Sequence, residues 1–82
     1  MRRHGLKTVI SNKGFIYFNH ATLVIESDQD WYISVADDQD NEYQGQLELV
    51  LETDEGHSYL TKGNYRDHRI TAVDSLHPLR VS

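Results

Sequence analysis

Apolar and polar residues alternate with a period of two along most of this chain, which is the pattern of half-buried β-strands. In the clearest run, Trp31, Ile33 and Val35 fall on one face of a strand, so we expect them in the core. No stretch shows the spacing of an amphipathic helix, so little or no helix is predicted. The predicted strands cover residues 6–10, 15–18, 22–26, 31–36, 42–52, 57–62 and 65–73, with a short last strand near Pro78.

Polar and glycine-containing segments separate these strands and predict the turns. Between the last two long runs, Gly63-Asn64 predicts a two-residue hairpin loop of type I′ or II′. With that loop, His57 and His68 become diagonal neighbours ~7 Å apart on one face of the hairpin. A shared metal ion or an acid–base pair would need a further ligand or a nucleophile, and we assign neither to that face. We therefore predict no metal site.

The predicted fold is all-β: a small antiparallel meander of about six to seven strands, closed or partly open as an SH3-like or Sm-like barrel. A two-sheet sandwich is the alternative. A flat open sheet is disfavoured because its long edges invite aggregation. The 82 residues suit a single small β domain covering 1–82. Since the chain has no cysteine and no apolar stretch of ~20 residues, we expect a cytoplasmic protein without a membrane segment.

One local motif adds to this fold prediction. Trp31-Tyr32-Ile33, followed by Asp37 and by Glu42-Tyr43, resembles the hairpin of WYL domains, which are Sm-like barrels in bacterial transcription regulators. The likeness covers about 14 of the 82 residues. Where that family usually has basic residues after the tyrosine, this chain has Gln44-Gly45-Gln46. The resemblance implies a small Sm-like or SH3-like barrel and transfers no ligand site.

Charge is sorted along the chain, whose formal net charge is −5. The 48 residues from Gly14 to Thr61 hold 11 carboxylates and no lysine or arginine. The eight basic residues lie outside that stretch: Arg2, Arg3, Lys7, Lys13, Lys62, Arg66, Arg69 and Arg80. Such sorting favours an electrostatic binding surface over a buried catalytic centre. The sequence also carries no phosphate-binding glycine loop, nucleophile elbow or zinc-binding helix motif, so neither enzyme activity nor a cofactor is predicted.

The leading hypothesis is a non-catalytic, acidic protein–protein interaction module that inhibits or modulates a basic nucleic-acid-handling protein by imitating nucleic-acid charge. Proteins of this size and charge occur among phage and mobile-element inhibitors of host nucleases, including CRISPR effectors, which is an analogy at the level of the class. The expected contact residues are Asp28, Asp30, Asp37, Asp38, Asp40, Glu42, Glu48 and Glu52. The simpler interpretation is solubility and ordinary turn formation. Asp38, Asp40 and Glu42 alternate as calcium ligands do, but Tyr43 and Leu49 replace the glycine and glutamate of a calcium loop.

A second hypothesis is a small β-barrel regulator that binds RNA or DNA through the basic and aromatic hairpin 57–73. Its candidate contact residues are Tyr59, Lys62, Tyr65, Arg66 and Arg69. The negative net charge opposes contact with phosphates, so direct nucleic-acid binding is the less favoured of the two hypotheses. A third hypothesis is an oligomeric structural subunit, and a homodimer is compatible with all three.

Overall fold

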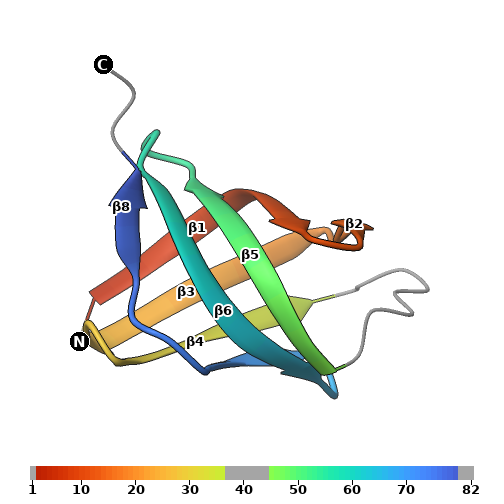
Figure 1. Ribbon diagram of the computed structural model, residues 1–82. Coiled ribbons are helices and arrows are strands. Elements are labelled where there is room, and N and C mark those ends of the chain that lie inside the picture. Colours follow the sequence, from red (N-terminus) through yellow and green to blue (C-terminus); the bar gives the residue numbers. More distant parts are fainter. Residues whose placement is uncertain (1, 37–44, 80–82) are drawn as a thin grey trace.

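The structure is a computed structural model that describes residues 2–36 and 45–79. This part of the chain forms eight antiparallel strands and contains no helix (Figure 1). In chain order the strands are β1 (Arg2–Ser11), β2 (Gly14–Phe15), β3 (His20–Ser27), β4 (Asp30–Ala36), β5 (Gly45–Thr53), β6 (Ser58–Arg66), β7 (Arg69–Ala72) and β8 (His77–Leu79). The all-β prediction is confirmed, and so is the short last strand at Pro78.

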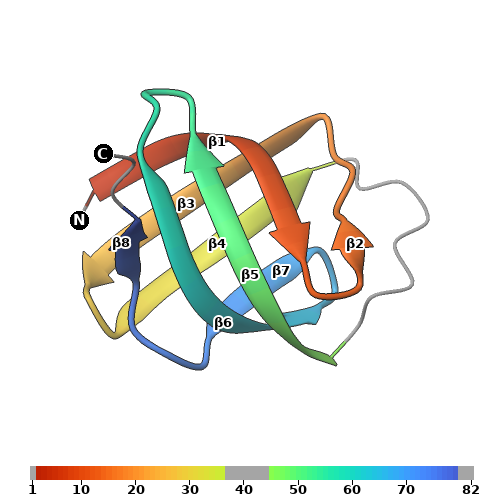
Figure 2. The same cartoon turned by 45° about the horizontal axis from the view of Figure 1, so that its top comes forward.

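Six of the strands close into a barrel in the order β1-β3-β4-β7-β6-β5, and pairing of β1 with β5 completes the ring (Figure 2). The predicted small barrel is thus confirmed, in place of the two-sheet sandwich. The other two strands are additions: β2 pairs with the end of β1, and β8 pairs with the start of β6. Of the strand predicted at 15–18, only Phe15 lies in a strand. Ile16 is buried after it, and its N–H donates a 3.0 Å hydrogen bond to the backbone oxygen of Val9.

Strand β1 closes the barrel because it changes neighbours along its length. Residues 2–5 pair with β3, and residues 6–11 pair with β5. The register with β5 shifts between Leu6 and Thr8, and such an irregularity bends and twists a strand. The bent strand therefore joins two parts of the sheet that are distant in sequence.

One cluster of apolar side chains fills the barrel. Trp31, Ile33 and Val35 are buried in it, as their alternation predicts, and so are the three leucines of β5. The indole N–H of Trp31 donates a hydrogen bond of 2.9 Å to the backbone oxygen of Asp74. A buried tryptophan needs such a partner for its one polar atom, and here the bond also ties the segment after β7 to the core.

The hairpin of β6 and β7 turns at Asp67 and His68, so the loop predicted at Gly63-Asn64 is wrong. Both turn residues have positive φ, 52° and 63°, as a two-residue type I′ loop requires. Aspartate and histidine adopt such angles more readily than most residues, so the turn forms without glycine. The first residue pair on either side of the turn is Arg66 with Arg69.

Gly63 is instead buried inside β6, and the reason is packing. A Cβ atom at this position would lie 2.5 Å from Cγ2 of Ile70 and 3.0 Å from Cδ1 of Leu49, so a larger residue would force the core to move. A glycine within a strand often permits such close approach. The corrected turn also places His57 before β6 and His68 beyond its end, so the predicted diagonal histidine pair does not form.

Candidate binding surfaces

The carboxylates predicted to bind a basic partner lie in separate places on the barrel. Asp28 and Asp30 are exposed where β3 turns into β4. On the outer side of β5, Glu48 is exposed and Glu52 is half-buried. Four of the predicted contact residues lie outside the described part of the chain, namely Asp37, Asp38, Asp40 and Glu42. The described carboxylates thus do not share one element or one turn.

Glu48 lies directly across from Lys62 of β6. Opposite charges at paired positions of antiparallel strands attract one another and weaken the local field. Asp74 and His77 line the same hollow as these two residues. This side of the barrel therefore carries mixed charge, and not the uniform negative field that the sequence suggests for residues 14–61.

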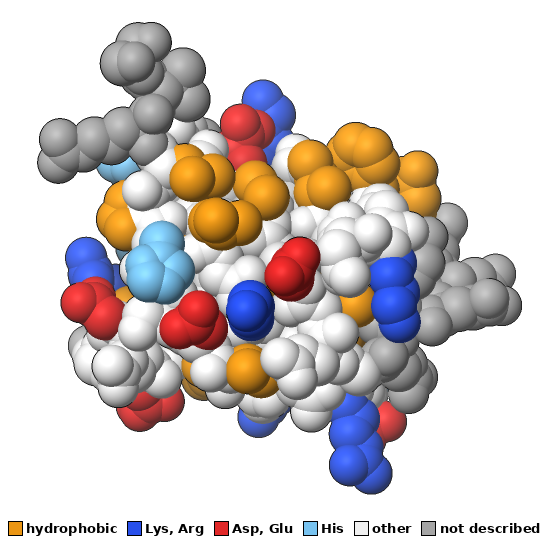
Figure 3. Space-filling view, viewed as in Figure 1, with side chains coloured by type: hydrophobic (Ala, Val, Ile, Leu, Met, Phe, Trp, Pro, Cys, Tyr) orange, Lys and Arg blue, Asp and Glu red, His pale blue; other side chains and the backbone are white. Residues whose placement is uncertain are grey.

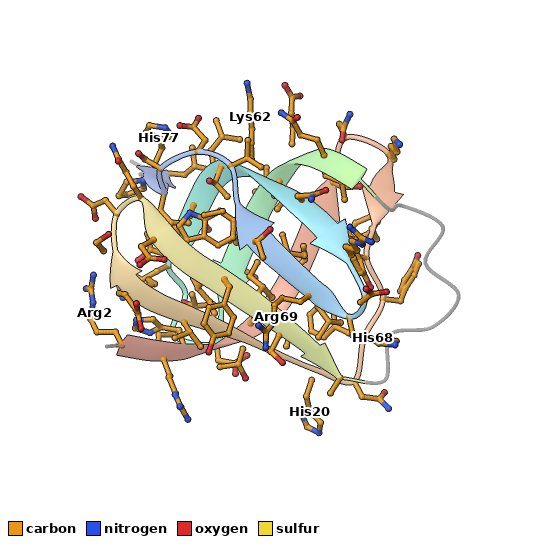
Figure 4. All side chains as sticks on the ribbon, turned by 90° about the horizontal axis from the view of Figure 1, so that it is seen from below. Arg2, His20, Lys62, His68, Arg69 and His77 are labelled. Atoms are coloured by element: carbon orange, nitrogen blue, oxygen red, sulfur yellow. The ribbon has the colours of Figure 1, made fainter. Side chains whose placement is uncertain are left out.

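The residues predicted to bind nucleic acid are also distributed over the barrel. Tyr65 is 2% exposed and belongs to the core, and Tyr59 packs against that core. Figure 4 shows Lys62 and Arg69 extending from different sides of the barrel. Arg66 and Arg69 occupy paired positions beside the β6–β7 turn. Of the five predicted residues, these two arginines remain as exposed neighbours.

Strands β3, β4 and β7 bring these two arginines beside Tyr32 and Arg3. The guanidinium carbon of Arg69 lies 4.9 Å from the centre of the Tyr32 ring, a cation–π contact that holds the arginine over the ring. Arg3 lies across from Val24, which in turn lies across from Tyr32. We name this surface the arginine face, and its residues are Arg3, Thr22, Val24, Tyr32, Ser34, Asn64, Arg66, Asp67, Arg69 and Thr71.

The arginine face forms because closure of the barrel places basic residues from the two ends of the sequence on strands that flank β3 and β4. These two strands come from the acidic middle of the sequence. β1 carries Arg3 and pairs with β3, while β7 carries Arg69 and pairs with β4. The outward residues Thr22 and Ser34, on the two strands between them, are neutral. Sequence reasoning missed Arg3 and Tyr32 because only the strand register brings positions 3, 32 and 69 together.

Ion pairing restrains these charges only weakly where it occurs. Asp67 lies 3.8 Å from Arg66, and both side chains are largely exposed, so their attraction is screened by water.

At the turn between β5 and β6, Nδ1 of His4 lies 3.0 Å from Oε1 of Glu55. The hydrogen bond from His4, and then its charge, lower the pKa of this exposed carboxylate. The contact joins β1 to the β5–β6 hairpin.

A different side of the barrel carries a row of outward-facing apolar residues. Phe15 lies across from Ile10, and Ile10 lies across from Val50. Val50 in turn lies across from Leu60 on β6. Phe15 is 51% exposed and Leu60 is 44% exposed. We name these four residues the apolar row; Figure 3 shows an apolar band on this side, with acidic and basic side chains below it.

Among residues 2–36 and 45–79, no three metal-ligating side chains gather as a group that could hold an ion. Nor does this part of the chain contain a helix long and apolar enough to span a bilayer. Compared with models of known protein families, with curated proteins and with solved structures, the chain gives no significant match.

Proposed function

We propose that this protein is a non-catalytic binding module that holds an extended polyanion, single-stranded nucleic acid in particular, on its arginine face. The observation that carries the proposal is the placement of Arg69 over the Tyr32 ring, beside Arg66 and across β3 and β4 from Arg3. Small barrels bind single strands on exposed sheet surfaces that combine basic and aromatic side chains. The interior is filled by the apolar core, so the outer surface supplies the binding chemistry.

The dimensions of the arginine face suit a short stretch of nucleic acid. Arg3 and Arg69 stand on β1 and β7, three strand spacings apart in the order β1-β3-β4-β7. That separation is ~14 Å at ~4.8 Å per spacing. At ~3.4 Å per stacked nucleotide, it corresponds to about four nucleotides. A site of this length lies at the lower end of the sites found on small single-strand-binding barrels.

Each part of the face has a role in such binding. A guanidinium group presents several N–H donors in a plane, which suits phosphate oxygens. The hydroxyls of Thr22, Ser34 and Thr71 lie among the arginines and can donate hydrogen bonds to the same backbone. Because the Tyr32 ring is covered by Arg69, we assign it to orienting that arginine and not to stacking on a base. The net charge of −5 opposes binding, so the affinity is expected to be modest and strongly salt-dependent.

The test is fluorescence anisotropy with labelled single-stranded DNA and RNA of mixed sequence, measured over a series of salt concentrations. Arg66→Ala and Arg69→Ala should each weaken binding and reduce the slope of log K against log salt by about 0.7. Lys62→Ala removes the same charge from a different side of the barrel and should leave both quantities unchanged. Equal losses in all three variants, or no binding at low salt, would contradict the proposal.

A second candidate is the acidic module that docks on a basic nucleic-acid-handling protein, such as a nuclease or CRISPR effector inhibited by a phage protein. The observation that favours it is the exposure of Asp28 and Asp30 at the same turn, where a protein partner could reach both carboxylates. Reversing both charges to lysine should then weaken a salt-sensitive protein complex. A complex that survives nuclease treatment and depends on these aspartates, but not on Arg66 and Arg69, would favour this candidate over the first.

A further inference from the structure

We infer that the apolar row lies in an interface with a second copy of this chain, centred on Val50 and Leu60, and that Glu48 and Lys62 set the geometry of the dimer. The interface would lie on β2 and β5 and on the parts of β1 and β6 around Ile10 and Leu60, whereas the arginine face uses the opposite ends of those two strands, at Arg3 and Arg66. It is therefore independent of the proposed binding of nucleic acid. A monomeric protein could still bind nucleic acid, and a dimer could form without it.

The need for a partner follows from the composition of the outer surface. Outward positions of a barrel in water are usually polar, whereas inward positions form the core. Here four strands in succession present Phe15, Ile10, Val50 and Leu60 in one continuous row. Leu79 of β8 lies two positions along from the partner of Leu60, and it is 40% exposed. Ile10 and Val50 are half-buried between the exposed Phe15 and Leu60. A contiguous apolar surface of this kind is typical of an interaction site.

Charge complementarity indicates that the partner at this interface is a second copy of the chain. A two-fold interface must be complementary to itself, because each side contributes the same surface. An axis parallel to the strands and midway between β5 and β6 exchanges the two strands. It places Val50 opposite Leu60 of the second copy, and it places Glu48 opposite Lys62 of the second copy. The pair of Glu48 with Lys62 then occurs twice across the interface, and β1 of one copy faces β8 of the other.

The alternative two-fold axis is unfavourable. An axis that runs across the strands, along the apolar row, would exchange the residues on either side of Val50. Glu48 would then face Glu52 of the second copy, because both lie two positions from Val50 on β5. Like charges placed opposite one another cost free energy, so the charges select the axis parallel to the strands.

The experiment is sedimentation equilibrium of the full chain from about 1 µM to about 1 mM, the range in which weak interfaces associate. The wild-type protein should pass from monomer to dimer. Glu48→Lys and Lys62→Glu should each weaken self-association by about tenfold or more, since both copies then present like charges. An equimolar mixture of the two variants should form a heterodimer, because each lysine again meets a glutamate. The double variant should recover the homodimer.

Two further variants separate interface from fold. Leu60→Lys should abolish dimer formation, whereas Ala36→Lys, which adds the same charge at an exposed position of β4, should leave the mass unchanged. Far-UV circular dichroism confirms that each variant is folded, and recovery of association in the mixture shows it independently. A wild-type protein that stays monomeric at the highest concentration would overturn the inference. So would single-charge variants that associate as strongly as the wild type, or a mixture in which no heterodimer forms.

Discussion

On both sides of the barrel the inward-facing residues form the apolar core, but the outward-facing residues of the two sides differ. Around β3, β4 and β7, and at the neighbouring ends of β1 and β6, the outward positions carry arginines, a tyrosine and hydroxyl side chains. Around β1, β5 and β6, the corresponding positions form the apolar row, with Glu48 and Lys62 beside it. The core therefore specifies a barrel, and the outward half of each strand decides what the barrel can bind. Changes to the core should affect both sides, whereas changes to one surface should leave the other intact.

Replacement of the buried tryptophan should have the largest effect, because Trp31 supports both sides from within. Trp31→Ala should cost about 3–5 kcal/mol, the loss typical of a large aromatic residue removed from a core. A domain of this size has a stability of only about 3–5 kcal/mol, so we expect the variant to be largely unfolded. Far-UV circular dichroism and urea denaturation measure this. Trp31→Phe should retain the fold at lower stability, and a fully stable Trp31→Ala protein would contradict the packing described.

A substitution in β6 should have the next largest effect, since this strand pairs with β5 on one side and β7 on the other at Gly63. Gly63→Ala should destabilise the protein by about 1–3 kcal/mol through overpacking against Ile70 and Leu49. The matched control is Asn64→Ala, an exposed change one residue further along the strand. Denaturation midpoints of the two variants give the comparison. Equal midpoints would show that the space beside Gly63 is not restrictive.

Removal of the tyrosine ring should affect the arginine face alone. Tyr32→Leu removes the ring beneath Arg69 and should cost about 0.5–1 kcal/mol of interaction. If Tyr32 orients Arg69 for its ligand, oligonucleotide affinity should fall by about two- to fivefold. Tyr32→Phe keeps the ring and should bind as the wild type does. Self-association through the apolar row should be the same in all three proteins, and a change in it would show that the two sides are coupled.

The smallest effect is expected at the contact between His4 and Glu55, which lies in neither surface as we define them. The folded state lowers the pKa of Glu55 below its ordinary value of 4.5, so the contact stabilises the protein above that pH. Its contribution is lost as the pH falls through the lowered pKa. His4→Gln should return the pKa of Glu55 toward 4.5, as NMR titration of the carboxyl carbon would show. A titration curve identical to that of the wild type would exclude this interaction.

The sequence predicts the barrel because buried residues recur at every second position along its strands. Trp31, Ile33 and Val35 alternate with polar neighbours, and this alternation alone places them in the core. Gly63 shows the limit of such reasoning. Gly63 followed by Asn64 is a sequence that favours a turn, but the close approach of Ile70 to Gly63 can be inferred only when the strand pairing is known. A local preference for a turn was thus overridden by packing.

The candidate surfaces were harder to predict than the fold, because they combine residues from distant strands. The outward position of Val50 follows from its alternation with the leucines of β5. Its neighbours Ile10 and Leu60 follow only from the register with β1 and β6. In the same way, the separation of acidic and basic residues along the sequence does not produce separate acidic and basic faces on the barrel. Closure of the barrel places Arg3 and Arg69 on either side of strands from the acidic stretch.

Because β1 pairs with both β3 and β5, it cannot complete its pairing until β5 has been synthesised. The strand ends at Ser11, and its second neighbour, β5, begins at Gly45. At about 5–20 residues per second, a ribosome needs about 2–7 s to add the intervening residues. Throughout that interval, one side of β1 has no strand to pair with. The ring can close only after β5 has been made and has paired with β1, so a nascent chain released before β5 would keep β1 as an open edge.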